Sequence, residues 1–330
     1  MYKYIILVSM IAAACGQPQK VKSNEIPKAD RTLIIDHLTR ITKTEGYRNF
    51  QNRPLLNQTA GYILSVFQQY ADTAWLQSYA IDDNIYHNVV CRFGTSSKPI
   101  IVVGAHYDVC GDQEGADDNA SGVTGLLELA RLLKSSSPDY PIELVAYSLE
   151  EPPFFRTPYM GSYIHAKSLH DQKTDVYGML VLEMIGFYND EKGSQNYPLK
   201  PMKVAYGTKG NFILLAKRSG SGPFVNRFSD VFNQAAELPV KQIKAPAKMQ
   251  GIDFSDHLNY WHFGYDALMI TNTAFYRNKN YHRTTDTMET LDIPRMASVI
   301  DGVYQALLEI SSEEYPEKKR LKKLQNKVII

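Results

Sequence analysis

Short apolar runs alternate with stretches of helical spacing along most of this chain. Apolar runs bounded by turn residues predict buried strands, at residues 88–93, 100–103, 142–147, 178–182 and 267–270. Apolar residues at helical spacing predict helices, within residues 32–70, 122–134, 162–169, 212–218, 224–238 and 294–311. Strands and helices in this order predict an α/β fold, a three-layer sandwich whose mostly parallel central sheet is flanked by helices.

Two predicted strands, 88–93 and 100–103, are separated only by turn-rich residues 94–99, so we expect them to form a hairpin. Cys91 lies in the first strand and Cys110 follows the second. Strand pairing would bring the two cysteines close together, and exported proteins favour disulfides. A disulfide and two free thiols both remain open.

Residues 1–15 have the pattern of an export signal: Lys3, a short apolar run, and small residues before Cys15. The apolar run is shorter than the ~20 residues that a membrane-spanning helix needs. The small residues also resemble a bacterial lipobox, although Ala12 stands where leucine is usual. We therefore expect export to the periplasm or cell surface, with a lipid on Cys15 anchoring the chain to the outer or inner membrane. Ordinary secretion with cleavage nearby is the alternative.

The remaining chain divides into a polar tether at residues 16–30, one large domain at 31–312, and a basic tail at 313–330. The tail includes a run of lysine and arginine at 318–323, typical of a solvated helix end. The whole sequence has 36 basic and 35 acidic residues, a formal net charge of +1. This balance gives no electrostatic reason to expect nucleic acid as a partner.

Residues able to bind a metal follow several of the predicted strands. His106 and Asp108 follow the run 100–103, and Asp118 lies in a turn of small residues before a predicted helix. Imidazole and carboxylate are the groups that bind zinc at neutral pH. Loops at the carboxyl edge of such a sheet are where sites form. A single histidine or acidic residue of this kind is more often structural, so the combination carries the argument.

Taken together and in order, six pieces between about residues 88 and 291 resemble the zinc aminopeptidase family that also contains the animal glutaminyl cyclases. The pieces are Gly104-Ala-His-Tyr-Asp108, Gly115-Ala-Asp-Asp-Asn-Ala-Ser-Gly122, Glu150-Glu151, Leu182-Glu-Met184, Ser255-Asp-His257 and His282-x-x-x-Asp-Thr287. The resemblance implies the zinc exopeptidase fold, of phosphorylase/hydrolase type, and a zinc peptidase domain at residues 31–312.

The resemblance also implies the metal ligands. His106 and Glu183 would hold one zinc ion, Glu151 and His282 the other, and Asp118 would bridge both. The family commonly has aspartate at the Glu183 position. Two ions per chain are expected, but one zinc on Asp118, Glu151 and His282 also gives a neutral site, so one ion remains open.

The same resemblance assigns roles to neighbouring residues. Asp108 would orient His106 through its second ring nitrogen, and the Asp118–Asn119 peptide would be cis. Glu150 would be the general base that takes a proton from a zinc-bound water. Adjacent side chains diverge at an extended strand end, so Glu150 would face the substrate while Glu151 faces the metal.

Three further residues have open roles. Asp256 and His257 would lie near the substrate end of the pocket, where a secondary catalytic role and a structural hydrogen bond are both open. Tyr281 precedes His282 and would contact substrate or pack. Residues 152–160, rich in proline and aromatic residues, would form a rigid pocket wall or a packed surface loop.

The function expected first is an exported metallo-aminopeptidase that acts on peptides. A glutaminyl cyclase is the first alternative, but the tryptophans usual in cyclases are replaced by Phe154, Phe155 and Tyr281. A carboxypeptidase is a second alternative, since Arg156 or Arg283 would be available to bind a substrate carboxylate. A catalytically silent binding module is a third, although relatives that lose catalysis tend to lose ligands.

Overall fold

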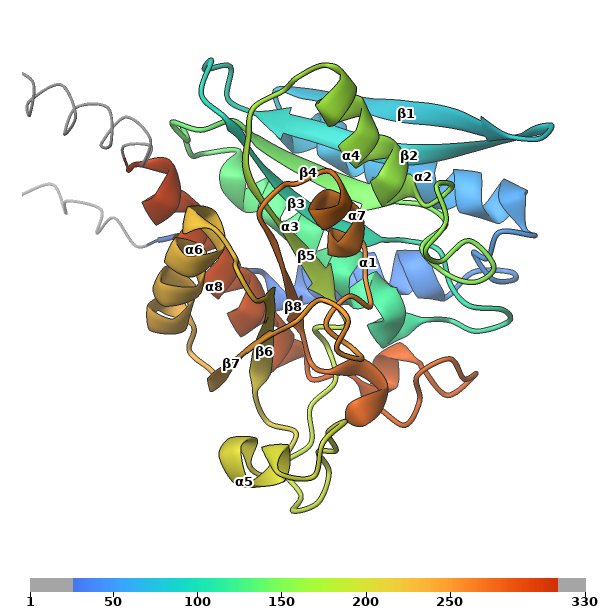
Figure 1. Ribbon diagram of the computed structural model, residues 1–330. Helices are drawn as coiled ribbons and strands as arrows, with labels where there is room; N and C mark the ends of the chain where they lie inside the picture. The colour runs from blue at the N-terminus through green and yellow to red at the C-terminus, as the bar shows by residue number, and fades with distance from the viewer. Residues whose placement is uncertain (1–25, 314–330) are drawn as a thin grey trace, which may run out of the picture.

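A single mixed sheet of eight strands forms the centre of the molecule in the computed structural model, which describes residues 26–313 (Figure 1). The strands are β1 (Thr73–Ile81), β2 (Asn84–Phe93), β3 (Ile100–His106), β4 (Ile142–Tyr147), β5 (Val176–Glu183), β6 (Ile213–Arg218), β7 (Val240–Ala245) and β8 (Ala267–Thr271). Their order across the sheet is β1-β2-β4-β3-β5-β8-β6-β7.

The middle of the sheet is parallel, as the alternation of strands and helices predicts. β4, β3, β5 and β8 run in one direction and pair in parallel. The direction reverses toward both sides, because β2 pairs antiparallel with β4 and β6 pairs antiparallel with β8. The carboxyl ends of the four central strands therefore meet at one edge of the sheet.

Helices cover both faces of the sheet, which completes the predicted three-layer sandwich (Figure 1). One face carries α1 (Arg31–Thr42), α2 (Arg53–Tyr70), α3 (Gly122–Leu133), α6 (Pro223–Ala235) and α8 (Ile293–Ser311). The other carries α4 (Gly161–Asp171) and α7 (His257–His262). The short helix α5 (Met202–Tyr206) lies outside these layers, beyond the end of β6 (Figure 1).

Two apolar cores lie on the two faces of the sheet. In β3, Ile101 and Val103 pack into the core beneath the five helices, whereas Val102 packs into the core beneath α4 and α7. Successive side chains of a strand point to opposite faces. A strand buried on both faces must therefore be apolar at nearly every position, which explains the uninterrupted run 100–103.

The predicted hairpin between residues 88–93 and 100–103 is wrong. β2 pairs with β1 and β4, and β4 separates it from β3. The hairpin partner is β1, which the apolar pattern does not reveal because most of its residues are exposed or half-buried. A two-residue turn at Asp82–Asp83 joins the two strands, with Asp82 in the left-handed region at φ 52°.

The prediction of a helix at residues 212–218 is also wrong. Residues Ile213–Arg218 form β6, which pairs with β7 and β8. A short apolar run does not by itself distinguish a strand from a buried helix. Neighbouring strands decide the outcome here, since they supply the hydrogen-bond partners for both sides of the segment.

The two described cysteines are free thiols, which settles the open question of a disulfide between them. Cys91 is buried within β2, and Cys110 is half-buried in the loop that follows β3. The intervening strand β4 keeps the two strands apart. Cys15, the predicted export signal, most of the predicted tether and residues 314–330 of the predicted tail lie outside the described residues.

The described end of the tether contacts the domain. The Ala29 amide donates to Asp301 at 2.6 Å, and the Asp30 amide donates to Glu128 at 2.7 Å. Asp30 also caps α1, because its side chain accepts from the amides of Thr32 and Leu33. Within residues 26–313, none of the helices combines the length and the apolar character needed to cross a membrane.

We expect Gly104→Ala to destabilise the fold by about 1–3 kcal/mol, the usual cost of overpacking a core. A Cβ atom at Gly104 would lie 2.3 Å from the ring of Tyr147, whose hydroxyl is fixed by a hydrogen bond with Tyr260. Urea unfolding measures the change. Gly61→Ala in α2 is the matched control, because a Cβ there meets nothing within 4 Å. Equal stability of the two variants would contradict the packing argument.

Candidate metal centre

Two of the predicted ligands are the last residues of central strands. His106 ends β3 and Glu183 ends β5. The alternation that buries Val102 and Val181 under α4 and α7 places His106 and Glu183 on that same face. The parallel register of β3 and β5 then brings the two strand ends side by side. His106 Nε2 lies 3.7 Å from Glu183 Oε2.

Asp118 lies between the two predicted histidine ligands, and each of its carboxylate oxygens faces one of them. Its Oδ1 is 3.3 Å from His106 Nε2, and its Oδ2 is 3.2 Å from His282 Nε2. The second histidine also approaches Glu151, with 3.1 Å between His282 Nε2 and Glu151 Oε2. The structure therefore brings all five residues together in the two groups that the resemblance implies, joined by Asp118.

Glu150 belongs to the same centre. Its Oε2 lies 3.9 Å from His106 Nε2, and ligand atoms of His106, Glu150 and Glu151 all lie within 4.8 Å of one another. The two glutamates therefore converge, contrary to the divergence expected at an extended strand end. The reason is local, since the chain leaves the extended form after β4 and Leu149 takes a φ of 61°.

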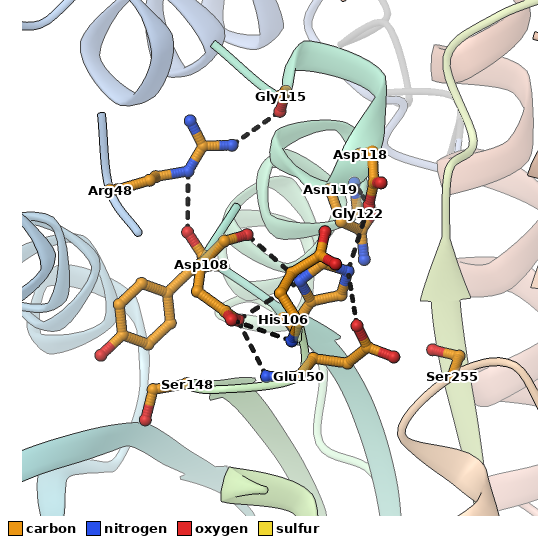
Figure 2. A network of polar contacts seen from close by, with 12 residues as sticks. Arg48, His106, Asp108, Gly115, Asp118, Asn119, Gly122, Ser148, Glu150 and Ser255 are labelled. Carbon is orange, nitrogen blue, oxygen red and sulfur yellow. Dashed lines mark hydrogen bonds and ion pairs between the residues drawn. The ribbon is translucent and has the colours of Figure 1, made fainter. Parts of the chain in front are cut away.

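Asp108 holds this arrangement in place, as Figure 2 shows. Its Oδ1 lies 3.4 Å from His106 Nδ1, and its backbone carbonyl lies 3.2 Å from the same ring nitrogen. Its two oxygens also accept hydrogen bonds from the backbone amides of Glu150 and Glu151, at 3.1 and 3.0 Å. One carboxylate thus positions three residues of the centre.

Glycines shape the turn that carries Asp118. Gly115 has a φ of 56°, and a Cβ there would lie 2.3 Å from the carbonyl oxygen of Asp118. At Gly122 a Cβ would lie 2.4 Å from the Leu182 carbonyl oxygen. The Asn119 amide group donates to that same carbonyl at 2.9 Å, which ties the turn to β5. The Asp118–Asn119 peptide is cis, as expected.

Two buried acids that were given no role beforehand support the Asp118 turn. Asp286 accepts the backbone amides of Asp117 and Asp118, each at 3.0 Å. Asp117 accepts the backbone amides of Gly186 and Phe187, and side-chain amides of Asn272 and Asn278. Asp286 belongs to the His-x-x-x-Asp-Thr piece, and Asp117 directly precedes Asp118. These positions within the motifs are the sequence features that point to a role for the two acids.

Arg48 is the buried cation beside these acids, and nothing in its sequence surroundings indicates this role. Its Nε donates to the Tyr107 carbonyl at 2.7 Å, and its Nη2 donates to the Gly115 carbonyl at 2.6 Å (Figure 2). Burial lowers the pKa of Arg48 to about 10, while Asp286 and Asp108 oppose the shift. The guanidinium therefore stays charged at neutral pH, and it clamps both loops that carry ligands.

The three residues with open roles have different environments. His257 is structural, because it is fully buried, its Nε2 bonds the Ile252 carbonyl at 2.7 Å, and its ring meets Trp261 edge-on. Tyr281 stacks on His282 with ring centroids 3.8 Å apart, so its ring packs against a predicted ligand. Asp256 is fully buried and its carboxylate oxygens have no hydrogen-bond partner, while its neighbour Ser255 donates to Glu183 at 2.6 Å.

The electrostatics of the centre favour bound positive charge. Burial raises the pKa of Glu151 to about 7, and nearby Asp118 adds to the shift. Burial lowers the pKa of His282, but the adjoining carboxylates of Asp118 and Glu151 outweigh this and raise it to about 10. A bound cation would neutralise the acids. The carboxylate of Glu151 would then be ionised and the imidazole of His282 neutral at the same time.

The residues fit zinc by their chemistry. They supply imidazole nitrogens and carboxylate oxygens, the donors that zinc takes. Three of the ligand atoms, Asp118 Oδ2, Glu151 Oε1 and His282 Nε2, are buried without a hydrogen-bond partner. Buried polar atoms without partners are costly, and a bound cation would satisfy them.

An apolar pocket opens beside the centre, and the sequence pattern does not reveal it. Glu183 contributes to its wall, so the pocket reaches the metal ligands. The rest of the wall is mostly apolar and aromatic and comes from β6, β7, β8, α5 and the loops around them. It includes Met202, Tyr206, Leu214, Ala216, Ile243, Phe254, Met269, Phe275 and Tyr276.

The chain belongs to peptidase family M28, whose model matches residues 88–307. The matched region contains every predicted metal ligand, from His106 to His282. The protein is thus a peptidase of the hydrolase class, and its family includes aminopeptidases. This chain is 42% identical to the uncharacterized protein YfbL of Escherichia coli K12 over 296 residues. The match covers 86% of this chain and 91% of YfbL.

Solved structures show the same fold. The aminopeptidase LapA of Legionella pneumophila matches with a TM-score of 0.70 and 21% identity, over 87% of this chain and 73% of LapA. A glutaminyl cyclase of Bacteroides thetaiotaomicron matches with a TM-score of 0.66 and 18% identity, over 88% of this chain and all (100%) of the cyclase. Both reactions therefore occur on this fold, and the site must distinguish them.

We expect Asp286→Asn to weaken zinc binding by about 10–100-fold, the usual cost of losing a group that supports metal ligands. Asparagine keeps one acceptor oxygen and turns an amide toward a backbone amide of the Asp118 turn. Zinc content after dialysis against a graded chelator measures the change. Asp190→Asn is the control, because Asp190 pairs with Arg295 at the surface. Unchanged zinc affinity in Asp286→Asn would contradict the role of this carboxylate.

Proposed function

We propose that this protein is a zinc-dependent aminopeptidase that removes apolar residues from the N-termini of peptides. The observation that carries the proposal is the position of Asp118, whose two oxygens face two histidines, each with its own glutamate beside it. This geometry supports a pair of metal sites, one formed by His106 and Glu183 and the other by Glu151 and His282, with Asp118 shared.

The bound zinc ions would polarise the scissile carbonyl and make water a better nucleophile. Glu150 is the residue placed to move the proton. It lies 3.9 Å from His106 and is not needed to complete either ligand set. Burial raises the pKa of Glu150 well above its usual value, with Glu151 and Glu183 adding to the shift. Glu150 would take a proton from the attacking water and pass it to the departing amine.

The apolar pocket supports the choice of substrate. Glu183 forms part of its wall, so a side chain held in the pocket would place its own carbonyl near the metal ligands. The lining favours leucine, methionine or phenylalanine over a charged residue, because burial of apolar surface provides the binding free energy. Glutamine, the substrate of a cyclase, would place a polar amide against a wall that is mostly apolar.

The alternatives find less support at the site. Arg156, one of two candidates for binding a substrate carboxylate, forms an ion pair with Asp253 at 2.7 Å. In the 152–160 loop, Phe154 packs against Phe50 and the core, which makes that part a packed loop. Phe155 contacts Phe254, a residue of the pocket wall, so the loop also supports the pocket. A silent binding module would not need the complete ligand set together with Glu150.

We further propose that the protein is exported and acts on peptides in the periplasm or at the cell surface. The support is the sequence of residues 1–15, with its single lysine, short apolar run and small residues before Cys15. Lipidation of Cys15 would anchor the chain to the outer or inner membrane.

A substrate panel with and without chelator tests the function. The purified protein is incubated with leucyl, phenylalanyl, alanyl and lysyl anilides and with a peptide that begins with glutamine. We expect chelator-sensitive release of free amino acid, fastest from the leucyl and phenylalanyl substrates, with activity restored by zinc. Ammonia and pyroglutamate from the glutamine peptide would instead establish a cyclase. Chelator-resistant hydrolysis would contradict the metal centre.

Glu150→Gln tests the general base. We expect turnover to fall by about 10²–10⁴-fold, the usual contribution of a positioned base, because glutamine has the same shape but cannot accept the proton. Zinc content should stay at the wild-type level, since Glu150 is outside the proposed ligand sets. Near-normal turnover would remove Glu150 from the mechanism, whereas loss of zinc would make it a ligand.

A further inference from the structure

Cys110 lies at the metal centre, although neither the motifs nor the family resemblance gives it a role. Its thiol sulfur and ligand atoms of Glu151 and His282 all lie within 4.8 Å of one another. Cys110 is half-buried, and it is a free thiol. It follows the Asp108 segment and precedes the Asp118 turn, so it joins the two loops that carry the ligands.

We propose that the Cys110 thiolate is a direct ligand of the metal ion held by Glu151, His282 and Asp118. The proposal rests on the two-metal centre put forward above and adds a fourth protein donor to one side of it. Coordination requires the thiol to lose its proton, which passes to solvent as the cation binds.

The surrounding atoms point to a ligand at this position. Glu151 is 4% exposed, and its Oε1 has no hydrogen-bond partner. His282 Nε2 and Asp118 Oδ2 are also buried without hydrogen-bond partners. Three ligand atoms without hydrogen-bond partners therefore belong to this site, two of them on the residues grouped with Cys110, and a bound cation would satisfy them.

The distances are within reach of coordination. Two donors of one tetrahedral zinc ion, at bond lengths of about 2.0–2.3 Å, lie roughly 3.5 Å apart. The pairs His282–Asp118 and His282–Glu151 already meet this at 3.2 and 3.1 Å. The Cys110 sulfur lies within 4.8 Å of the other two ligand atoms, so it needs to approach by no more than about 1 Å.

A sulfur ligand would make the two metal sites unequal. Asp118, Glu151, His282 and Cys110 form a four-donor set, the number that closes a tetrahedral zinc site. His106, Asp118 and Glu183 form a three-donor set, which leaves a position open for water or substrate. Thiolate also favours zinc or cadmium over manganese and magnesium. The closed site would therefore retain its ion longer.

X-ray absorption at the zinc edge of the fully loaded, full-length protein tests the proposal directly. We expect a zinc–sulfur distance of about 2.3 Å beside the shorter zinc–oxygen and zinc–nitrogen distances. Cys110→Ala should abolish it, and Cys110→Ser serves as the near-isosteric second variant. Cys91→Ala and Cys15→Ala are the matched controls, because these substitutions remove the other two cysteines and should preserve the signal.

Metal affinity provides the second readout. In competition with a chromophoric chelator, Cys110→Ala should lose one of its two zinc ions at a chelator concentration at least roughly tenfold lower than the wild type. The ion at the His106 site should be held as before. Cys91→Ala should follow the wild-type curve.

The outcomes separate this inference from the proposed function. Wild-type protein that binds zinc without a zinc–sulfur distance would overturn the role of Cys110 and leave the aminopeptidase proposal intact. A zinc–sulfur distance that persists in Cys110→Ala would also overturn it. Wild-type protein that binds no zinc would overturn the metal centre itself. If a variant fails to fold, the presence or absence of a zinc–sulfur distance in the wild-type spectrum still tests the proposal.

Discussion

Mutual repulsion among buried carboxylates is the constraint on which this molecule depends. Asp118, Glu150, Glu151 and Glu183 are all less than 10% exposed and lie around two imidazoles. Acids at such separations in a medium of low dielectric constant do not remain ionised without positive charge nearby. In the proposed function, cations supply that charge, and peptide hydrolysis uses the same cations.

A second group of buried acids holds the loops of the centre in place, because each of these acids accepts hydrogen bonds from backbone amides. Asp108 accepts the amides of the Glu150-Glu151 pair, and Asp286 accepts the amides of the Asp118 turn. These hydrogen bonds satisfy the buried carboxylate oxygens and fix the loops that leave the strands. Arg48 adds one buried positive charge and ties both loops together through their carbonyl groups. The rigidity of the centre therefore comes from residues that need not touch substrate.

The antiparallel side of the sheet serves a different purpose. β6 and β7 extend the sheet past β8 and provide part of the wall of the apolar pocket beside Glu183. A chain with only the central parallel strands would have the acids and histidines but no wall on this side. The metal ligands and the pocket therefore come from different parts of the same sheet. In the proposed function, the ligands at the parallel centre hold the zinc ions, and the added strands help to select the substrate side chain.

The sequence by itself determined the elements that repeat a strong local pattern, and the ligands that stand in ordered motifs. The buried strands β3, β4, β5 and β8 are apolar at nearly every position, so their pattern is unambiguous. His106, Asp118, Glu151, Glu183 and His282 were identified because each lies in a short piece whose order matches a known family. The structure places all five together.

Only the tertiary structure decided the features that depend on residues distant in sequence. β1 is half-exposed, and the apolar run of β6 does not by itself distinguish a strand from a helix, so their identity as strands follows from the neighbours that bond them. Arg48 has an ordinary local sequence, and its role arises because the fold buries its charge beside acids far along the chain. Cys110 reaches Glu151 and His282 for the same reason. The local sequence pattern indicates which residues are buried and where the chain turns. The charged partners of a residue depend instead on which strand ends the fold brings to one edge of the sheet.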